Sequence, residues 1–312
     1  MTSQAATGEP SAIEATTAPE SAQGASQWFG AWVELRRNPL FWISAVLILV
    51  FTVMAVAPHL FTSLDPNYAD LSRAREKPSE DAIFGFDQQG YDVYARTIYG
   101  ARASIMVGVL GSLATTLFGS LMGVIAAYSG GWVDAVLQRT GEIFFGIPLL
   151  LGGMLFLYQF PSDIDDPLIE QVMKIVLVIG LLGWPTIARI MRSAVLQVKA
   201  SDYVQAARAL GASPRRIIFS HLVPNALAPV VVVATINLGV YIGVEATLSF
   251  LTIGLQPPAI SWGLAISDAS GIGLIRAAPH MLLFPSLFLS LTVLAFILLG
   301  DAVRDALDPK LR

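Results

Sequence analysis

Glu245 is the most informative single residue of the sequence, because it is an acidic residue near the middle of a long apolar segment. At the centre of a membrane helix such a side chain costs roughly 3 kcal/mol unless it is neutralised, paired or hydrated. Asn237, Tyr241 and Ser249 share its helical face at intervals of four residues. This polar stripe indicates a surface that lines a pathway through a membrane. The alternative is a structural pair between Glu245 and an arginine of the same or a partner chain.

Other residue types that carry catalysis or bind metals are sparse. His59, His221 and His280 lie far apart without helical spacing, which argues against a metal or haem site. The sequence has no cysteine, so disulfides and thiolate chemistry are excluded. No G-x-S-x-G occurs, and none of the four lysines follows a glycine, which excludes a P-loop. We therefore expect no catalytic residue, no metal site and no cofactor bound by this chain.

A polar and basic stretch, residues 198–225, lies between two apolar segments and cannot lie in lipid. Ser201 or Asp202 can cap a helix, and Gly211 supplies the left-handed residue that ends it. Pro214 stands in the first turn of a second helix, which we expect Pro224 to end. The sequence therefore predicts a helix-turn-helix elbow.

The surface of this elbow combines small and basic residues. Its alanines let another backbone approach closely, and its arginines provide donors for carboxylates or anionic head groups. This composition indicates a docking surface; the alternative is a loop that only folds against its own helices. The residues expected to form the surface are Asp202, Tyr203, Gln205, Ala206, Ala207, Arg208, Leu210, Gly211, Ala212, Ser213, Arg215 and Arg216.

Composition places the remainder of the chain in a membrane. Of its 312 residues 54% are hydrophobic and 13% are charged, whereas soluble proteins carry about 25% charged residues. A bilayer-spanning helix needs roughly 20 residues. Six segments are long enough, at 40–60, 104–128, 143–160, 172–192, 226–254 and 281–300. We predict an all-α membrane protein with six transmembrane helices.

Two of these segments carry small residues at every fourth position, as close helix packing requires. The packing seams are Gly111, Thr115, Gly119, Gly123 and Ala127 in the second segment, and Thr235, Gly239, Gly243 and Thr247 in the fifth.

Basic residues cluster before the first segment, in the elbow and after the last segment. The positive-inside rule therefore places the elbow and both termini in the cytoplasm. Residues 1–27 lack an apolar run and are predicted to be a disordered cytoplasmic tail. Residues 28–38 predict an amphipathic helix at the membrane interface. Residues 39–312 form the membrane domain, with an outer loop at 62–101. No basic block suits nucleic acid.

The elbow resembles the "EAA" loop of ABC-importer permeases. The triplet reads Gln205-Ala206-Ala207, the glycine is Gly211, and the end reads His221-Leu222-Val223-Pro224. Four further stretches resemble the dipeptide/oligopeptide/nickel branch of that family. They are G-F-D-Q-Q-G-Y-D-V at 85–93, with Phe86 and Tyr91 departing from the pattern, E-A-T-L-S-F-L at 245–251, P-P with S-W-G at 257–263, and the end of the chain at 299–312. The resemblance covers about 39–312 and is to the C-type subunit.

The resemblance implies a type I ABC-importer permease fold in the bacterial cytoplasmic membrane, with the elbow as the coupling helix. It also implies the partners: a second homologous permease, two ATP-binding subunits that hold ATP and magnesium, and an extracytoplasmic substrate-binding protein. Di- and oligopeptides are the implied substrates. Nickel complexes, opines and glutathione-like peptides are alternatives, and a membrane scaffold without transport is a more distant one.

Overall fold

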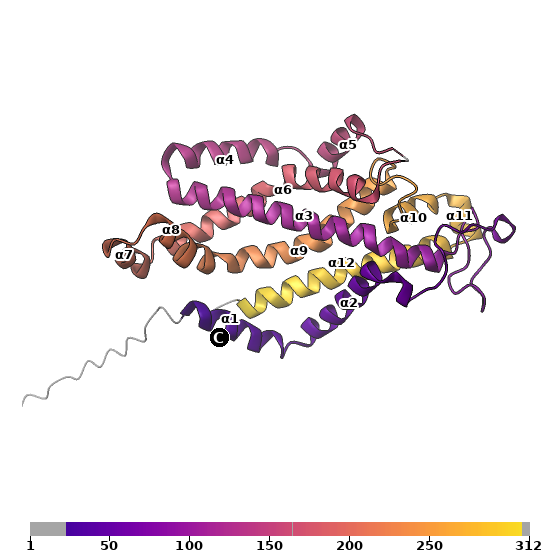
Figure 1. Ribbon diagram of the computed structural model, residues 1–312, viewed down its shortest axis with the longest axis horizontal. Coiled ribbons are helices and arrows are strands. Elements are labelled where there is room, and N and C mark those ends of the chain that lie inside the picture. The colour runs from indigo at the N-terminus through magenta and orange to yellow at the C-terminus, as the bar shows by residue number, and fades with distance from the viewer. Residues whose placement is uncertain (1–22, 164, 308–312) are drawn as a thin grey trace, which may run out of the picture.

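The computed structural model describes residues 23–163 and 165–307. Long helices run side by side, and these residues contain isolated β-bridges but no β-strand. Figure 1 shows the elbow helices α7 (Asp202–Ala209) and α8 (Pro214–Arg216) at one end of the bundle. The short helices α10 (Trp262–Asp268) and α11 (Ile272–Ala277) lie at the opposite end. The predicted all-α fold class is confirmed.

Five helices are long and apolar enough to cross a membrane by themselves. In the fourth of these, the helical stretch begins at Pro214, because α9 continues directly from the elbow. The five are α2 (Pro39–Val56), α3 (Val93–Ser129), α6 (Leu168–Lys199), α9 (Val223–Phe250) and α12 (His280–Leu307).

The third predicted span, 143–160, is not one straight helix. It belongs to α4 (Gly131–Phe145) and α5 (Leu149–Gln159), which meet at an angle of 80°. Pro148 lies at the break, where its ring removes a backbone donor and disfavours a helical conformation of the preceding residue. The predicted number of six spans therefore holds only if this bent pair is counted as one span.

The segment predicted as an interfacial helix, 28–38, forms most of α1 (Gln23–Leu35). This helix begins inside the predicted tail of residues 1–27, of which 1–22 lie outside the described residues. Ala31 is buried against the end of α12. The position of α1 at a membrane interface stays a prediction.

The small-residue seam of α3 packs directly on α6. A Cβ atom added at Gly119 would lie 2.7 Å from the backbone oxygen of Trp184, and one added at Gly123 would lie 2.5 Å from that of Ala188. Only glycine lets the two backbones approach this closely. The predicted seam in the second span is confirmed.

The seam of α9 is covered over only part of its length. Gly239 faces α12, where an added Cβ atom would lie 3.0 Å from the backbone oxygen of Val293. Gly243, one turn further along, has no atom within 4 Å of such a Cβ. One part of this seam is therefore open in the isolated chain.

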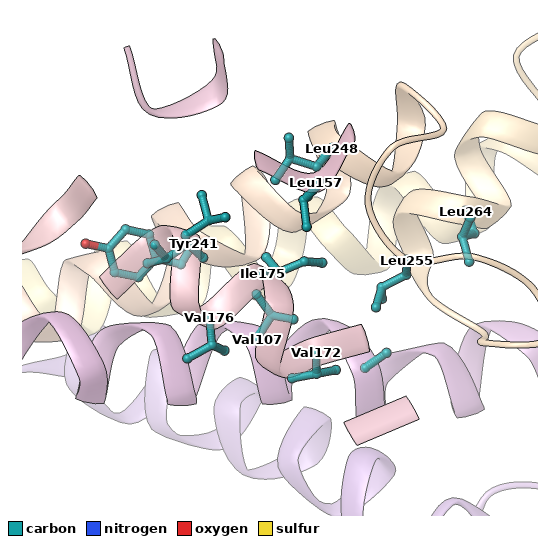
Figure 2. Close-up of a cluster of buried hydrophobic side chains, with 12 residues drawn as sticks. Val107, Leu157, Val172, Ile175, Val176, Tyr241, Leu248, Leu255 and Leu264 are labelled. Carbon is teal, nitrogen blue, oxygen red and sulfur yellow. The ribbon is translucent and has the colours of Figure 1, made fainter. Parts of the chain in front are cut away.

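The hydrophobic core lies where α3, α5, α6 and α9 meet. Figure 2 shows Tyr241 and Leu248 from α9 near Ile175 and Val176 from α6, all of them buried. Val107 of α3 belongs to the same cluster. Because the elements come from distant parts of the sequence, this cluster holds the two halves of the chain together.

Glu245 lies in a polar junction beside this core and is fully buried. The Ser104 hydroxyl of α3 donates a hydrogen bond of 2.8 Å to one carboxyl oxygen, and the Ser249 hydroxyl donates one of 2.9 Å to the other. Ser261, which is buried and caps α10, lies close to the same carboxyl group. The junction thus joins α3, α9 and the start of α10 through side chains rather than through an arginine.

The residues after Ser261 tighten the same junction. Trp262 is fully buried, and its indole N–H donates a hydrogen bond of 2.8 Å to the backbone oxygen of Thr97. A Cβ atom at Gly263 would lie 2.7 Å from the Cα of Ala246. Two of the sequence stretches that carry the family resemblance, 245–251 and 257–263, therefore meet at one place in the fold.

The outer loop between α2 and α3 is shaped by its own glycines and aspartates. Gly85 and Gly90 have positive φ angles of 73° and 79°, which favour glycine. The Asp87 carboxylate accepts hydrogen bonds from the backbone N–H groups of Gln89, at 2.8 Å, and Tyr91, at 2.9 Å. The loop sequence therefore specifies a folded cap.

Asp92 ends this loop, because its carboxylate caps α3 by accepting a hydrogen bond of 2.7 Å from Ala95 N–H. Helix α3 therefore begins at Val93, inside the segment 62–101 that is predicted as the outer loop. The two residues that depart from the family pattern both stack with arginines: Arg73 lies 4.1 Å from the ring centre of Phe86, and Arg96 lies 4.5 Å from that of Tyr91.

A matched pair of glycine substitutions tests the packing seams. Gly123→Ala forces the α6 backbone away and should destabilise the purified chain by about 1–3 kcal/mol. Gly243→Ala adds the same methyl group where the isolated chain has room, and should stabilise its helix by up to about 1 kcal/mol. Unfolding of both variants in detergent should therefore shift in opposite directions. Equal shifts would contradict the assignment of the seam.

A second pair tests the junction around Glu245. Glu245→Gln keeps an acceptor oxygen for one serine and offers an N–H donor to the other, whose hydroxyl can accept, so it should unfold close to the wild type. Glu245→Leu leaves buried hydroxyls without partners, which costs about 1–3 kcal/mol for each group. Thermal unfolding of both variants measures the difference. If the glutamine variant is as unstable as the leucine variant, the carboxyl group has a partner other than these hydroxyls.

Candidate functional site

The first helix of the elbow ends as the sequence predicts. Gly211 has a φ of 81°, and its N–H donates a hydrogen bond of 3.0 Å to the Arg208 oxygen. The N–H of Ala212 donates one of 3.0 Å to the oxygen of Ala207. This pair of bonds is the Schellman arrangement, which satisfies carbonyl groups at the end of the helix. Gly211 thereby sets the direction in which the chain leaves α7.

The second helix does not end at Pro224, so that prediction is wrong. Ser213 caps α8 by accepting a 3.4 Å hydrogen bond from Arg216 N–H, and a π-helical turn, Ile217–Leu222, then leads directly into α9. In this turn the N–H of Val223 donates to the oxygen of Ile218. The wider turn shifts the bonding pattern just before Pro224, whose missing N–H then falls in the first turn of α9, where helices tolerate it.

One side of the elbow is anchored in the bundle. Val204 and Leu222 are fully buried, and Ile217 is almost so. They pack in one cluster with residues of α6 and α9, among them Val195 and Ala226. Burying such a side chain stabilises the folded state by about 1.5–3 kcal/mol. The elbow is therefore a fixed part of the fold.

Two basic residues connect the helices that support the elbow. The Lys199 ammonium donates hydrogen bonds of 2.8 and 2.9 Å to the backbone oxygens of Ala127 and Tyr128 at the end of α3. This is the helix end at which a positive charge is favourable. Arg192 of α6 makes two hydrogen bonds of 2.6 Å to Asp134 of α4. Both contacts tie α6 to its neighbours next to the elbow.

The other side of the elbow is open. Leu210 is 89% exposed and Phe219 is 71% exposed. Among the described residues, none forms an ion pair with Arg208, Arg215 or Arg216, which are also exposed. The surface thus offers two large apolar side chains surrounded by free positive charges.

The predicted surface residues divide between exposed and partly buried positions. Sequence reasoning missed Phe219; its signal was a large aromatic residue inside a polar stretch. The exposed residues are Asp202, Gln205, Ala206, Arg208, Leu210, Gly211, Ser213, Arg215 and Arg216, and the partly buried ones are Tyr203, Ala207 and Ala212. The structure therefore brings all twelve together on one elbow.

The polar stripe of α9 faces the inside of the chain. Tyr241, Glu245 and Ser249 are buried, and the Asn237 amide lies 3.4 Å from the Tyr241 hydroxyl. The polar stripe is therefore a packed face of α9 in this chain, and the seam is packed as well at Gly239. The pairing of Glu245 with an arginine of this chain is not observed in the described residues. A role of the stripe in a pathway stays a prediction.

In the described part of the chain, no three histidine, aspartate or glutamate residues cluster as a metal site requires.

Two family profiles match the chain. The profile described as "Binding-protein-dependent transport system inner membrane component" matches residues 119–312. That described as "N-terminal TM domain of oligopeptide transport permease C" matches residues 26–78. The first covers more than half of the chain and contains the elbow.

Curated relatives and a solved structure agree with these profiles. The oligopeptide transport system permease protein OppC of Bacillus subtilis is 35% identical over 305 residues, 97% of each chain. The dipeptide transport system permease protein DppC of the same organism is 37% identical over 283 residues, 90% of this chain and 85% of that one.

The structure of the inward-facing MetNI methionine ABC transporter aligns with a TM-score of 0.53 at 19% identity. The alignment covers 74% of this chain and 100% of that one. At this identity, the likeness shows only that the two chains share a fold. The chain therefore belongs to the family of binding-protein-dependent inner-membrane transport components, and is a multi-pass permease subunit of an ABC importer in the bacterial inner membrane.

Proposed function

We propose that this permease subunit moves short peptides into the cell, and that its elbow docks on an ATP-binding subunit that drives the movement. The observation that carries the proposal is the elbow itself. It is anchored through Val204, Ile217 and Leu222 on one side and exposes Leu210 and Phe219 on the other. An elbow that is fixed to the bundle and binds a partner through its exposed side chains can transmit a movement of that partner to α6 and α9.

The chemistry of the exposed side supports a protein partner. Large apolar side chains that are buried at the centre of an interface supply much of its binding energy. The free arginines Arg208, Arg215 and Arg216 favour a partner surface that carries carboxylates. We therefore expect an apolar cleft with an acidic rim on the ATP-binding subunit.

The positions of the two ends of the chain support a cytoplasmic location of the elbow. The end of α12 and the described start of the chain lie near the elbow end of the bundle, away from the outer loop and α10 (Figure 1). Basic residues flank the spans at the elbow end, as the positive-inside rule requires of the cytoplasmic side. The opposite end of the bundle is then the surface that contacts an extracytoplasmic binding protein. A second permease subunit completes the pore.

Peptides are the proposed substrate because the relatives named above transport oligopeptides and dipeptides. Nickel complexes, opines and glutathione-like peptides remain the alternatives, since selectivity resides largely in the delivering protein. Catalysis of ATP hydrolysis is assigned to the partner subunits, with their ATP and magnesium.

A matched pair of leucine substitutions tests the docking surface. Leu210→Glu places a charge at the exposed tip of the elbow and should abolish co-purification of the ATP-binding subunits from native membranes. Leu71→Glu makes the same change at a residue that is 75% exposed in the outer loop, and should leave co-purification intact. The measurement is the yield of ATP-binding subunits per tagged permease. Normal yields from both variants would contradict docking at the elbow.

The turn at Gly211 can be tested through coupling. Proline cannot adopt a φ of 81° and has no N–H for the bond to Arg208, so Gly211→Pro should misdirect α7. Peptide uptake per ATP hydrolysed should fall sharply, while the purified complex keeps its unfolding temperature. Gly211→Asn is the control, because asparagine tolerates a left-handed conformation. A proline variant that transports peptides as efficiently as the control would rule out this turn as the coupling element.

A further inference from the structure

The residues that follow α9, 251–256, form a turn that contains a strained residue. Thr252 has a φ angle of 60°, and a β-branched residue rarely adopts this left-handed conformation. Such a conformation persists only where the surrounding contacts enforce it, and it is frequent in segments that switch between two arrangements. The contacts of this turn therefore indicate what it does.

The end of α9 holds one side of the turn. The N–H of Thr252 donates a hydrogen bond of 3.0 Å to the backbone oxygen of Ser249. The N–H of Leu255 donates one of 3.1 Å to the Ser249 hydroxyl, which itself donates to the carboxyl group of Glu245. The turn is thus joined to the buried polar junction.

The start of α6 holds the other side of the turn through Gln171, which is 1% exposed. Its side-chain oxygen accepts a hydrogen bond of 2.9 Å from the N–H of Gln256, and its side-chain nitrogen donates one of 3.2 Å to the backbone oxygen of Asp166. The side chain of Gln256 then donates a hydrogen bond of 2.9 Å to the backbone oxygen of Thr252. One buried amide therefore connects α6 to the strained residue through a single neighbour.

The turn has room to move away from α6. A cavity of about 720 Å³ borders it, lined by Gln171 and Asp166 on one side and by Pro258 and Ala259, which follow the turn, on the other. Polar groups that are released toward this cavity can bind water in place of one another, so opening the turn costs little in hydrogen bonding.

Opposing contributions act on the turn. Strain at Thr252 favours its opening, whereas the bonds of Gln171 and the side chain of Leu255, which is fully buried in the hydrophobic core, favour the closed turn. Strain, burial of one leucine and one or two hydrogen bonds are contributions of similar size. A modest input of free energy can therefore shift the balance between the closed and the open turn.

We propose that the 251–256 turn is a gate segment at the end of the bundle opposite the elbow, held closed by Gln171 and made ready to open by strain at Thr252. Because α9 runs from the elbow to this turn (Figure 1), a movement of α9 that starts at the elbow reaches the turn directly. The inference rests on the proposed function, because it names a segment that responds to the coupling described there.

Leu255→Cys reports on the position of the turn, since the chain has no cysteine of its own and Leu255 is fully buried. In the assembled complex without nucleotide, this cysteine should react slowly with a charged, water-soluble thiol reagent. Adding Gln171→Leu should accelerate the reaction about tenfold, as expected for loss of the hydrogen bonds that close the turn.

Gln88→Leu is the matched control for Gln171→Leu. The Gln88 side chain also donates a hydrogen bond, of 2.7 Å, to a backbone oxygen, that of Asp268, but it lies outside the turn. This variant should leave the reaction of Leu255→Cys unchanged. If Gln171→Leu accelerates the reaction no more than Gln88→Leu, Gln171 does not hold the turn. Ile253→Cys, at a half-buried residue of the same turn, replaces Leu255→Cys if that variant does not assemble.

Thr252→Gly tests the strain. Glycine adopts a positive φ angle readily, so this variant should slow the reaction of Leu255→Cys about fivefold and raise the unfolding temperature of the purified chain by about 2 °C. Thr247→Gly makes the same exchange inside α9 and should lower that temperature. If both glycine variants lower the unfolding temperature, Thr252 is not strained.

Opening during transport is tested by arresting the complex with ATP and vanadate. The reaction rate of Leu255→Cys should then differ at least about fivefold from the rate without nucleotide, as expected for coupled sites. Equal rates in both states would overturn the gate and leave the turn a fixed part of the fold. Failure of the proposed function is seen separately, because Leu210→Glu removes the ATP-binding subunits, whereas the effect of Gln171→Leu is measured without nucleotide.

Discussion

The buried carboxyl group of Glu245 imposes a constraint that organises the half of the bundle away from the elbow. In an apolar interior such a group needs hydrogen-bond partners; here Ser104 and Ser249 donate to it, and Ser261 lies close by. Each serine belongs to a different segment, so satisfying one group fixes three segments relative to one another. Trp262 then fills the adjoining space and binds the backbone of α3.

The other half of the molecule is held by close backbone packing and by contacts at the helix ends. The glycines of α3 let α6 approach, and Lys199 and Arg192 fasten α6 to the ends of α3 and α4. The elbow grows out of these fixed helices. Its anchored side shares their core, which leaves Leu210 and Phe219 for a partner.

The two faces of α9 have separate tasks. Its polar residues hold the bundle together, whereas the opposite face is left open within the chain at Val240 and Gly243. A membrane protein gains little from burying apolar side chains against other apolar helices, because lipid is an equally apolar neighbour. Polar contacts and small residues therefore decide which face packs, and the apolar face is free for transport or for a partner.

Much of this protein was determined by the sequence itself. Apolar length indicated the spans, and the Gly211 turn and the seam of α3 followed from local residue types. Only the tertiary structure decided that the polar stripe of α9 faces inward, that α4 and α5 form a bent pair, and that a π-helical turn carries the chain past Pro224. Local signals specify where a helix forms. Its rotation about its own axis depends on contacts with segments such as Ser104 and Ser261, which are distant in the sequence and adjacent only in the fold.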